Sequence, residues 1–186
     1  MKEKLKQDIQ TCGRSLLLPI GVMAPIGMLM GITGALTQAY LIERMPFLGN
    51  DVIQAIFESL KNISTVIFNN IPLLFAMGVA YGLSKKEKGI AVFSSVLGYL
   101  TLLVTMNVYL TLTGTLITEN PTVAGQGMVL GIHTLRIDAI GGIIAGIVAA
   151  RTADKYYKLE LPLVFAFFGG KKSVPIITFA CMIPIG

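Results

Sequence analysis

Residues 130–151, LGIHTLRIDAIGGIIAGIVAAR, decide the fold, because a polar lead is joined here to a helix of small residues. The lead contains the only histidine of the chain, His133, and two charged residues, Arg136 and Asp138. From there to Arg151 the chain is uncharged and rich in glycine and alanine. A polar lead followed by an apolar segment of small residues is typical of a chain that enters a membrane and packs against a partner helix.

Small residues recur at every fourth position of this segment, at Gly142, Gly146 and Ala150. Because residues four apart lie on one face of a helix, the three form a stripe. In lipid, such a stripe lets the backbone of a second helix approach closely, so that van der Waals contact drives association. We therefore predict that these residues make a helix contact, either within one subunit or between two.

The overall composition is that of a membrane protein. Hydrophobic residues make up 54% of the 186 residues and charged residues 13%, and the mean hydropathy is +0.74. An ordinary soluble domain has roughly 25% charged residues. The net charge of +5 would suit a nucleic-acid partner, but the basic residues lie in short clusters between apolar runs, without a basic aromatic surface. We therefore expect a lipid bilayer and no nucleic acid.

Long uncharged runs predict where the chain crosses the bilayer, since about 20 apolar residues span the hydrocarbon layer. The sequence predicts an all-α integral membrane protein with four complete transmembrane helices, a truncated fifth helix and a cytoplasmic N-terminus. The expected spans are roughly residues 15–42, 63–84, 89–112, 135–152 and 173–186. The last apolar run is too short to cross, so we expect the chain to end inside its fifth helix.

Two features accompany the second expected span. The preceding loop contains DVIQAIFESLKNI, residues 51–63, whose apolar residues have helical spacing and suit a helix lying along the membrane surface. Asn69 and Asn70 then interrupt the first half of the span. Polar residues at membrane depth can mark a substrate path. We favour the simpler interpretation that this pair lies at the outer interface, because residues 73–83 are the cleaner apolar part.

The distribution of Lys and Arg predicts the orientation, because cytoplasmic loops of membrane proteins are enriched in these residues. With a cytoplasmic N-terminus and four crossings, the outer segments hold only Arg44, Lys61 and Arg136. The inner segments hold the rest of the 15 basic residues, namely Lys2, Lys4, Lys6, Arg14, Lys85, Lys86, Lys88, Arg151, Lys155, Lys158, Lys171 and Lys172. Topology thus accounts for the positive net charge.

The sequence contains no recognisable catalytic or metal-binding constellation. Cys12 and Cys181 have neither metal-ligand spacing nor a disulfide framework. Cys12 stands beside Arg14 but leads into a helix rather than a soluble catalytic fold. His133 stands without the further ligands that a metal site needs. We therefore predict no catalytic, substrate-binding or metal-binding residue in this chain, and no cofactor.

Arg136 and Asp138, two residues apart, have both a structural and a functional interpretation. Charged residues near a membrane pair with one another or with polar groups of neighbouring helices, and some mark a substrate path. We expect a structural polar pair at the mouth of the fourth helix.

Three segments carry a family resemblance that covers nearly the whole chain: GRSLLLPIGVMAPIGMLMGI (13–32), NNIPLLFAMGVAYGLSKKEKGIAVFSSVLGYL (69–100) and LELPLVFAFFGGKKSVPII (159–177). They resemble the enzyme IIC permeases of the phosphoenolpyruvate-dependent sugar phosphotransferase system, glucose superfamily. FFGGKKSVPI, Phe167 to Ile176, is the most specific of these signals. KGIAVFSSVLGY, the later Asn107 and LGIHTLRIDAIGGIIAGI look closest to the maltose/glucose type, with glucose and N-acetylglucosamine permeases as near alternatives.

The resemblance implies ten transmembrane helices in two parts. Residues 1–186 would form the first part, a dimerisation scaffold, and the sugar-binding histidine and glutamate would lie in the second. His133 is therefore not expected to be the family's sugar-binding histidine. The implied protein is a homodimer of the bacterial inner membrane. Lys171 and Lys172 then suit either docking of a phosphorylated IIB domain or a simple cytoplasmic anchor.

The implied function is uptake of a sugar, maltose or glucose, coupled to its phosphorylation by a IIB domain or protein. Two alternatives remain at this point: a non-catalytic membrane scaffold, or a fragment of another secondary transporter. Polar side chains within the expected spans are scattered over different helices, whereas a sugar site needs several hydrogen-bonding groups in one cavity. We therefore expect the 186 residues alone neither to transport nor to phosphorylate a sugar.

Overall fold

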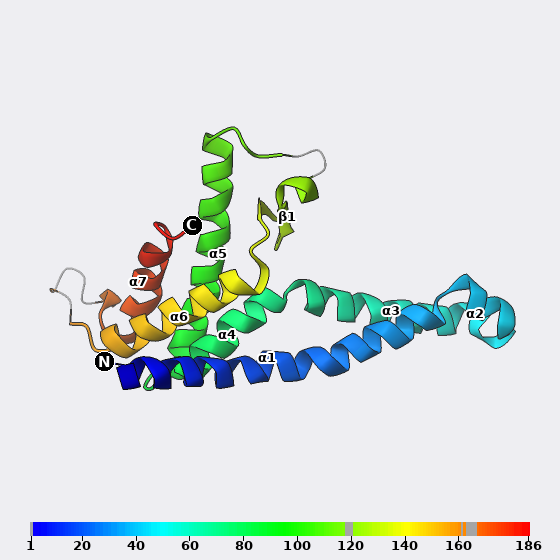
Figure 1. The fold of residues 1–186 in the computed structure, drawn as a ribbon, viewed down its shortest axis with the longest axis horizontal. Coiled ribbons are helices and arrows are strands. Elements are labelled where there is room, and N and C mark those ends of the chain that lie inside the picture. The colour runs from blue at the N-terminus through cyan, green and yellow to red at the C-terminus, as the bar shows by residue number, and fades with distance from the viewer. Residues whose placement is uncertain (1, 118–120, 161, 163–166) are drawn as a thin grey trace. The chain divides into compact units, whose positions relative to one another are not determined.

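The structure, a computed structural model, describes residues 2–117, 121–160, 162 and 167–186 and is mostly helical (Figure 1). It divides into two compact units. One unit consists of Pro19–Asn70, and the other combines Met1–Leu18 with Ile71–Gly186. The first helix, α1 (Lys2–Leu36), contributes residues to both units.

The unit Pro19–Asn70 contains the second part of α1, the short helices α2 (Ala39–Arg44) and η1 (Pro46–Gly49), and α3 (Asp51–Asn69). The helix α3 begins where the side chain of Asn50 accepts a hydrogen bond from the Val52 amide at 2.9 Å, a standard N-terminal cap. The side-chain Nε2 of Gln54 donates to two backbone carbonyls, those of Leu48 at 2.7 Å and Leu36 at 3.3 Å. These bonds satisfy carbonyls left open at the helix ends.

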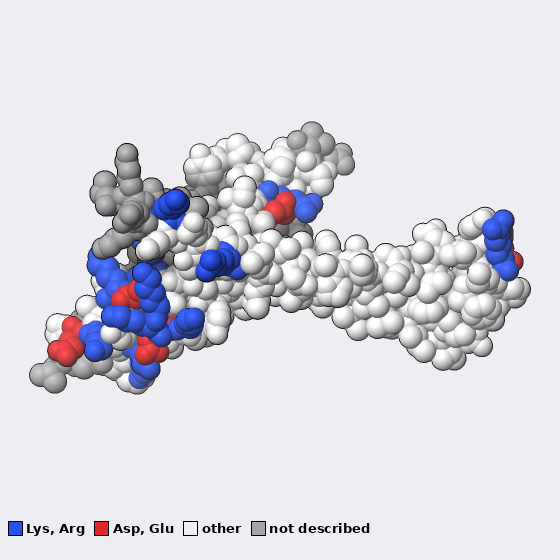
Figure 2. Space-filling model, turned by 60° about the horizontal axis from the view of Figure 1, so that its bottom comes forward, with Lys and Arg blue, Asp and Glu red and all other residues white. Residues whose placement is uncertain are grey.

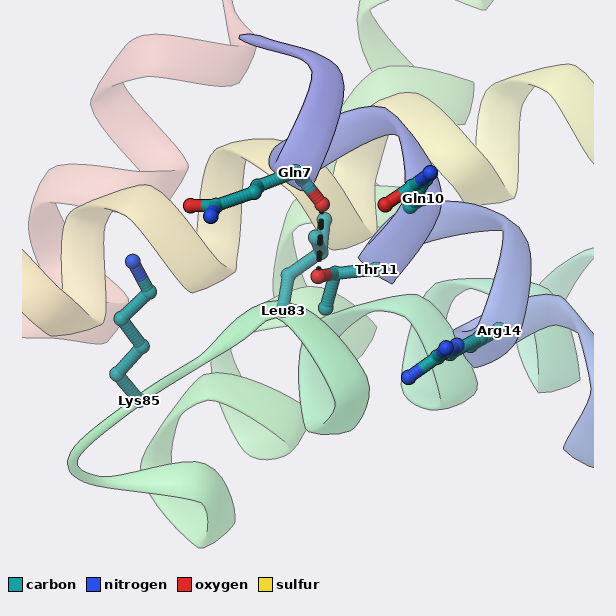
Figure 3. A pocket seen from close by; sticks show the side chains of 6 residues that line it. All are labelled: Gln7, Gln10, Thr11, Arg14, Leu83 and Lys85. Carbon is teal, nitrogen blue, oxygen red and sulfur yellow. Dashed lines mark hydrogen bonds between the residues drawn. The ribbon is translucent and has the colours of Figure 1, made fainter. Parts of the chain in front are cut away.

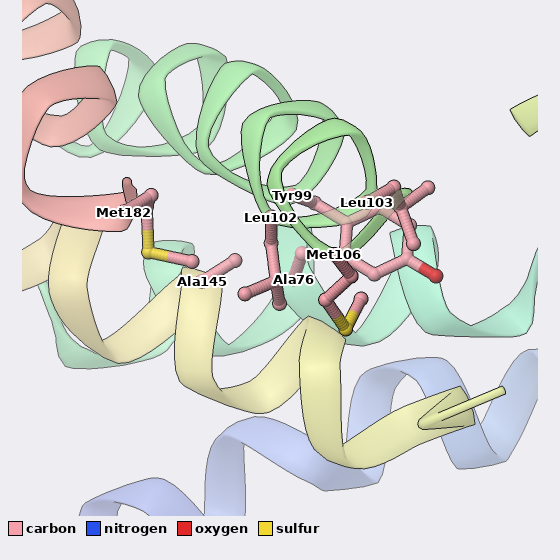
Figure 4. Packing of buried hydrophobic residues seen from close by; sticks show 7 residues of the cluster. All are labelled: Ala76, Tyr99, Leu102, Leu103, Met106, Ala145 and Met182. Atoms are coloured by element: carbon pink, nitrogen blue, oxygen red, sulfur yellow. The ribbon is translucent and has the colours of Figure 1, made fainter. Parts of the chain in front are cut away.

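The other unit contains the helices α4 (Ile71–Leu83), α5 (Lys88–Leu112), α6 (Asp138–Tyr156) and α7 (Ser173–Met182). Two short helical turns, η2 (Pro121–Ala124) and η4 (Gly170–Lys172), precede a hairpin and α7 respectively. Figure 4 shows the main apolar cluster, to which α4, α5, α6 and α7 all contribute. Its buried members are Ala76, Tyr99, Leu102, Leu103, Met106, Ala145 and Met182.

A second buried cluster of this unit consists mostly of alanine, with Ala80, Ala91, Ala149, Ala153 and Val174. Small side chains on α4 and α6 allow their backbones to lie close together, and dispersion contacts at short range then hold them. At the crossing of α5 and α7, a side-chain carbon at Gly98 would meet Thr178 at 3.1 Å. Packing in this unit thus depends on small residues.

A two-stranded antiparallel hairpin precedes α6, formed by β1 (Gln126–Val129) and β2 (Ile132–Leu135). Its two-residue turn has positive φ at both Leu130 (51°) and Gly131 (80°), as a type I′ hairpin turn requires. The chain is mostly helical, as expected, but the segment that was expected to open a helix near residue 135 forms the strand β2. The helix begins at Asp138.

Two helices of the described chain are long and apolar enough to cross a membrane, Gln10–Leu36 and Lys88–Leu112. A third candidate arises if α3 and α4 together make one broken span. The break falls at Asn70, and Pro72 follows in the first turn of α4, where a residue without an amide proton is tolerated. The span expected at 63–84 is therefore divided between two helices.

The helix α6 contains Asp138, Arg151, Asp154 and Lys155, which leave an uncharged stretch at residues 139–150. At 1.5 Å per residue such a stretch is shorter than the ~30 Å hydrocarbon layer. Among the described residues, two or three candidates meet the criteria of length and composition, so the expected count of four spans plus a truncated fifth is not confirmed.

Candidate functional site

The stripe of small residues on α6 faces α4. A side-chain carbon added at Gly146 would meet the carbonyl oxygen of Ala76 at 2.7 Å and Cβ of Val79 at 2.8 Å. One added at Gly142 would overlap the carbonyl oxygen of Pro72. Ala150 is buried as well. The structure therefore places the stripe within this unit, at a helix crossing where a larger side chain does not fit.

Asp154, near the C-terminal end of α6, holds the loop between α4 and α5. One of its carboxylate oxygens accepts hydrogen bonds from the backbone amides of Lys85 at 2.9 Å and Lys86 at 3.2 Å. The same oxygen accepts a third bond from the hydroxyl of Ser84 at 3.2 Å. Bonds to an ionised acceptor are the stronger kind, so this carboxylate fixes the loop to α6.

Lysine side chains reinforce the same junction. Lys86 Nζ lies 3.1 Å from the hydroxyl of Tyr157, to which it donates, and 4.6 Å from the centre of its ring. This hydrogen bond lowers the pKa of Tyr157, aided by the charge of Lys158, because a nearby cation favours the phenolate. Lys171 forms an ion pair with Glu87 at 2.8 Å. Three segments distant in sequence are thus joined: the α4–α5 loop, the end of α6 and η4.

Lysines in these three segments and directly beside them form what we call the basic surface: Lys85, Lys86, Lys88, Lys155, Lys158, Lys171 and Lys172. Figure 2 shows Lys and Arg side chains gathered in a patch with a few Asp and Glu side chains among them. Several of the lysines lie over tyrosine rings, for example Lys88 over Tyr81 at 4.7 Å. Such a surface attracts anions and anionic lipid.

In the predicted pair, Arg136 follows β2 directly and Asp138 is the first residue of α6. Arg136 Nη2 lies 3.7 Å from Asp138 Oδ1. Both side chains are mostly exposed, so this ion pair contributes little to stability. The stem of Arg136 covers Gly127 of the neighbouring strand, where a side-chain carbon would meet its Cδ at 2.9 Å. Asp138 has a positive φ of 40°, a strained conformation for a residue other than glycine.

His133 lies in β2, opposite Met128. Its backbone carbonyl accepts a hydrogen bond of 2.7 Å from the side chain of Asn107 in α5, which links the hairpin to that helix. Its Nε2 atom is buried and has no hydrogen-bond partner among the described residues. The structure therefore brings together His133 and Asn107, two polar residues that stand far apart in the sequence.

Gln126 is a structural residue that sequence reasoning missed. It is buried, donates to the carbonyl of Thr115 at 2.8 Å and accepts from the amide of Ile117 at 3.0 Å. These bonds attach the chain that leaves α5 to the hairpin. The one sequence signal at this position is that Gln126 stands between Gly125 and Gly127, in a stretch that favours turns.

Hydrogen bonds, an ion pair and cation–π contacts hold the junction of these segments. Within the residues that the structure describes, no group of three or more His, Cys, Asp or Glu side chains is placed to hold a metal ion. Cys12 is half-buried and Cys181 exposed, and both are free thiols. The described fold is thus that of a helical domain with candidate membrane spans and a basic surface at one helix junction.

Comparison with known protein families assigns this helical domain to one of them. The family model of the phosphotransferase system EIIC matches residues 13–186, and the chain belongs to that family of membrane permeases.

Two curated relatives are similar along almost the entire chain. The glucose-specific EIICBA component of the phosphotransferase system from Staphylococcus saprophyticus is 37% identical over 177 residues, which is 95% of this chain and 26% of that protein. The maltose-specific EIICB component from Escherichia coli is 32% identical over 188 residues, which is 100% of this chain and 36% of that protein. The chain therefore spans about a quarter to a third of the length of these relatives.

Proposed function

We propose that this chain is the N-terminal, scaffold part of a sugar permease that takes up glucose or maltose while a IIB domain phosphorylates the sugar. The observation that carries the proposal is the similarity to glucose-specific and maltose-specific components over 95% and 100% of the chain. Membership of the family also sets aside an unrelated secondary transporter. Both relatives have EIIC and EIIB in one named component, which supports a IIB partner.

The proposed division of labour places the sugar-binding groups outside residues 1–186. It is supported by the chemistry of the described residues, since a sugar site requires converging hydrogen-bond donors and acceptors. The polar groups Asn107 and Gln126 bond to backbone carbonyls of this chain instead. The described part of the chain therefore supplies packing surfaces and a basic surface to the permease.

The proposed topology has a cytoplasmic N-terminus, four crossings and the start of a fifth, in the inner membrane of a bacterium. Support comes from the basic surface, because the loop 84–88, the end of α6 and η4 are all assigned to the cytoplasmic side by their lysines. These segments contact one another through Asp154, Lys86 and Lys171. Arg136, assigned to the outer side, contacts Asp138 and the hairpin instead.

We further propose that Gly142, Gly146 and Ala150 form a helix contact within the subunit, and that the permease is a homodimer. The close approach of α6 to Ala76 and Val79 supports the first point. The second follows from the scaffold role proposed for this part of the permease.

A chimera tests the proposed function. The matching region of the maltose-specific EIICB component is replaced by residues 1–186 of this chain, in cells that lack their own glucose and maltose permeases. We expect phosphorylated maltose to accumulate from radiolabelled sugar, because the relative supplies the remaining parts and this chain the scaffold. Glucose and N-acetylglucosamine are measured in parallel.

Two controls make the result interpretable. The chain without the added remainder is expected to give no sugar phosphate above background. A chimera that carries Gly142→Leu is expected to lose uptake through defective packing of α4 and α6. A chimera that reaches the membrane in normal amount yet moves none of the sugars would contradict the proposal.

A further inference from the structure

A polar pocket of about 300 Å³ lies between the beginning of α1 and the end of α4, within one compact unit (Figure 3). It is lined by Gln7, Gln10, Thr11, Arg14, Leu83 and Lys85. Figure 3 shows Arg14 and Lys85 on opposite sides of Leu83. The pocket thus combines two cations and two amides around a single apolar side chain.

Helix geometry explains why these side chains converge. Positions 7, 10, 11 and 14 of α1 share one face, because residues three and four apart are neighbours on a helix. That face is fixed against α4 by Ser15, which lies so close to Gly82 that a side chain there would overlap the serine. The pocket is therefore a consequence of how α1 crosses the end of α4.

The lining suits an anion. No described carboxylate lines the pocket. Two acids near the same loop have other partners: Glu87 pairs with Lys171, and Asp154 accepts from the loop amides. The Thr11 hydroxyl donates to the Gln7 carbonyl at 2.8 Å. Arg14, Lys85 and the two glutamine amides remain as donors toward the pocket. Arg and Lys donors bind phosphate oxygens with charge-assisted bonds.

The position of the pocket identifies the source of the phosphate. Gln10 is the first residue of the apolar part of α1, and Leu83 is the last residue of α4. Both therefore lie where candidate spans end, at the depth of lipid headgroups. Basic pockets at the cytoplasmic ends of membrane helices bind anionic headgroups, and Leu83 offers an apolar wall for the adjoining lipid.

We propose that this pocket binds the phosphate of an anionic lipid headgroup, of the phosphatidylglycerol kind. The inference uses the proposed cytoplasmic placement of the α4–α5 loop, but not the identity of the transported sugar. The bound lipid would fix the beginning of α1 to the membrane surface. Loss of the lipid would therefore leave sugar specificity unchanged.

The test is a titration of phosphatidylglycerol into delipidated protein in neutral detergent, followed by native mass spectrometry. For the double variant Arg14→Gln and Lys85→Gln we expect about a tenfold loss of affinity, since two charge-assisted contacts are removed. The matched control, Lys155→Gln with Lys158→Gln, removes the same charge from the basic surface outside the pocket. It is expected to change the affinity less than about twofold.

Further arms separate the alternatives. Phosphatidylcholine, which is zwitterionic, is expected to bind equally weakly to all variants. Inorganic phosphate that displaces the lipid at equal concentration would overturn the lipid assignment and indicate a free anion site. Equal losses in the pocket variant and the control variant would overturn the pocket itself and leave only general attraction to the basic surface. Circular dichroism of each variant verifies that the helices are retained.

Discussion

Gly142 of α6 lies so close to the carbonyl oxygen of Pro72 in α4 that no side chain fits between them. The obstacle is backbone rather than a flexible side chain, so it cannot move aside without displacing α4. One turn further along α6, Gly146 stands in the same relation to Ala76. Two successive turns of one helix thus rest directly on the backbone of another.

Enlarging this stripe should force the helices apart. For Gly146→Leu we expect a loss of about 1–3 kcal/mol in the free energy of unfolding, as for overpacking elsewhere. Gly142→Ala is expected to destabilise as well, since even a methyl group overlaps the Pro72 carbonyl. Thermal unfolding in detergent, followed by circular dichroism, measures both effects.

The control for these variants is Gly89→Ala at the start of α5, where a side-chain carbon has open space. It is expected to leave stability unchanged or to raise it slightly, because alanine is the better helix former. The dimer fraction is followed in the same samples. If Gly146→Leu changed neither the unfolding temperature nor the dimer fraction, the stripe would have no role in packing.

Local periodicity explains what the sequence predicted well. The expected helix at residues 89–112 coincides with α5 (Lys88–Leu112), because a long uncharged run has few alternatives in lipid. The stripe on α6 was predicted from the spacing of small residues alone, and its role in packing stays a prediction. Both features depend on neighbours within one helix, which the sequence displays directly.

What the sequence did not predict depends on turns and on distant partners. The turn of the hairpin at Gln126–Leu135 requires a positive φ at Leu130. Leucine is not a residue that favours such a turn, so no sequence signal indicated it. The bonds from the α4–α5 loop to Asp154 join positions about 70 residues apart, so no local pattern indicated them.

Removal of the Asp154 carboxylate should loosen the α4–α5 loop. Asp154→Ala leaves the amides of Lys85 and Lys86 and the hydroxyl of Ser84 without their acceptor. We expect a loss of roughly 1.5–3 kcal/mol, the range for hydrogen bonds to a charged group. Hydrogen exchange followed by mass spectrometry should show faster exchange in residues 84–87.

Glu160 provides the matched control, since it is an exposed acid that follows the same helix. Glu160→Ala is expected to leave exchange in residues 84–87 and the unfolding temperature unchanged. Asp154→Asn should fall between wild type and Asp154→Ala, because an amide oxygen still accepts but lacks the charge. Unaltered exchange in Asp154→Ala would show that the loop is held by other contacts.

Tyr157 should ionise at a lower pH than an ordinary tyrosine. The hydrogen bond from Lys86 lowers its pKa, and the charge of Lys158 lowers it further. Lys86→Met should therefore raise the pKa toward its usual value, so that less phenolate is present at a given alkaline pH. Carbon-13 NMR of labelled tyrosine reports this titration, with Tyr157→Phe to assign the signal. Lys155→Met, which removes a lysine from the neighbouring Tyr156 ring, should leave it unchanged.

The orientation in the membrane can be measured at two positions. Lys86 belongs to the basic surface, and the positive-inside rule places it in the cytoplasm. Ala124 lies in the last position of η2, before the hairpin, and the same topology places it outside. We replace Cys12 and Cys181 by alanine, introduce Lys86→Cys or Ala124→Cys, and add a membrane-impermeant maleimide to intact cells. Labelling is expected at position 124 and not at position 86.

Labelling after permeabilisation of the cells shows whether an unlabelled position lies on the cytoplasmic side or is buried in the protein. Lys86 is exposed in the fold, so position 86 should label once the reagent reaches the cytoplasm. The replacement Lys86→Cys removes one basic residue, and eleven of the twelve assigned to the inner segments remain, which preserves the charge bias. Labelling of intact cells at position 86 but not at 124 would reverse the orientation. In that case the loop that carries Lys85 and Lys86 would face outward, which would contradict the cytoplasmic placement that the proposed lipid pocket requires.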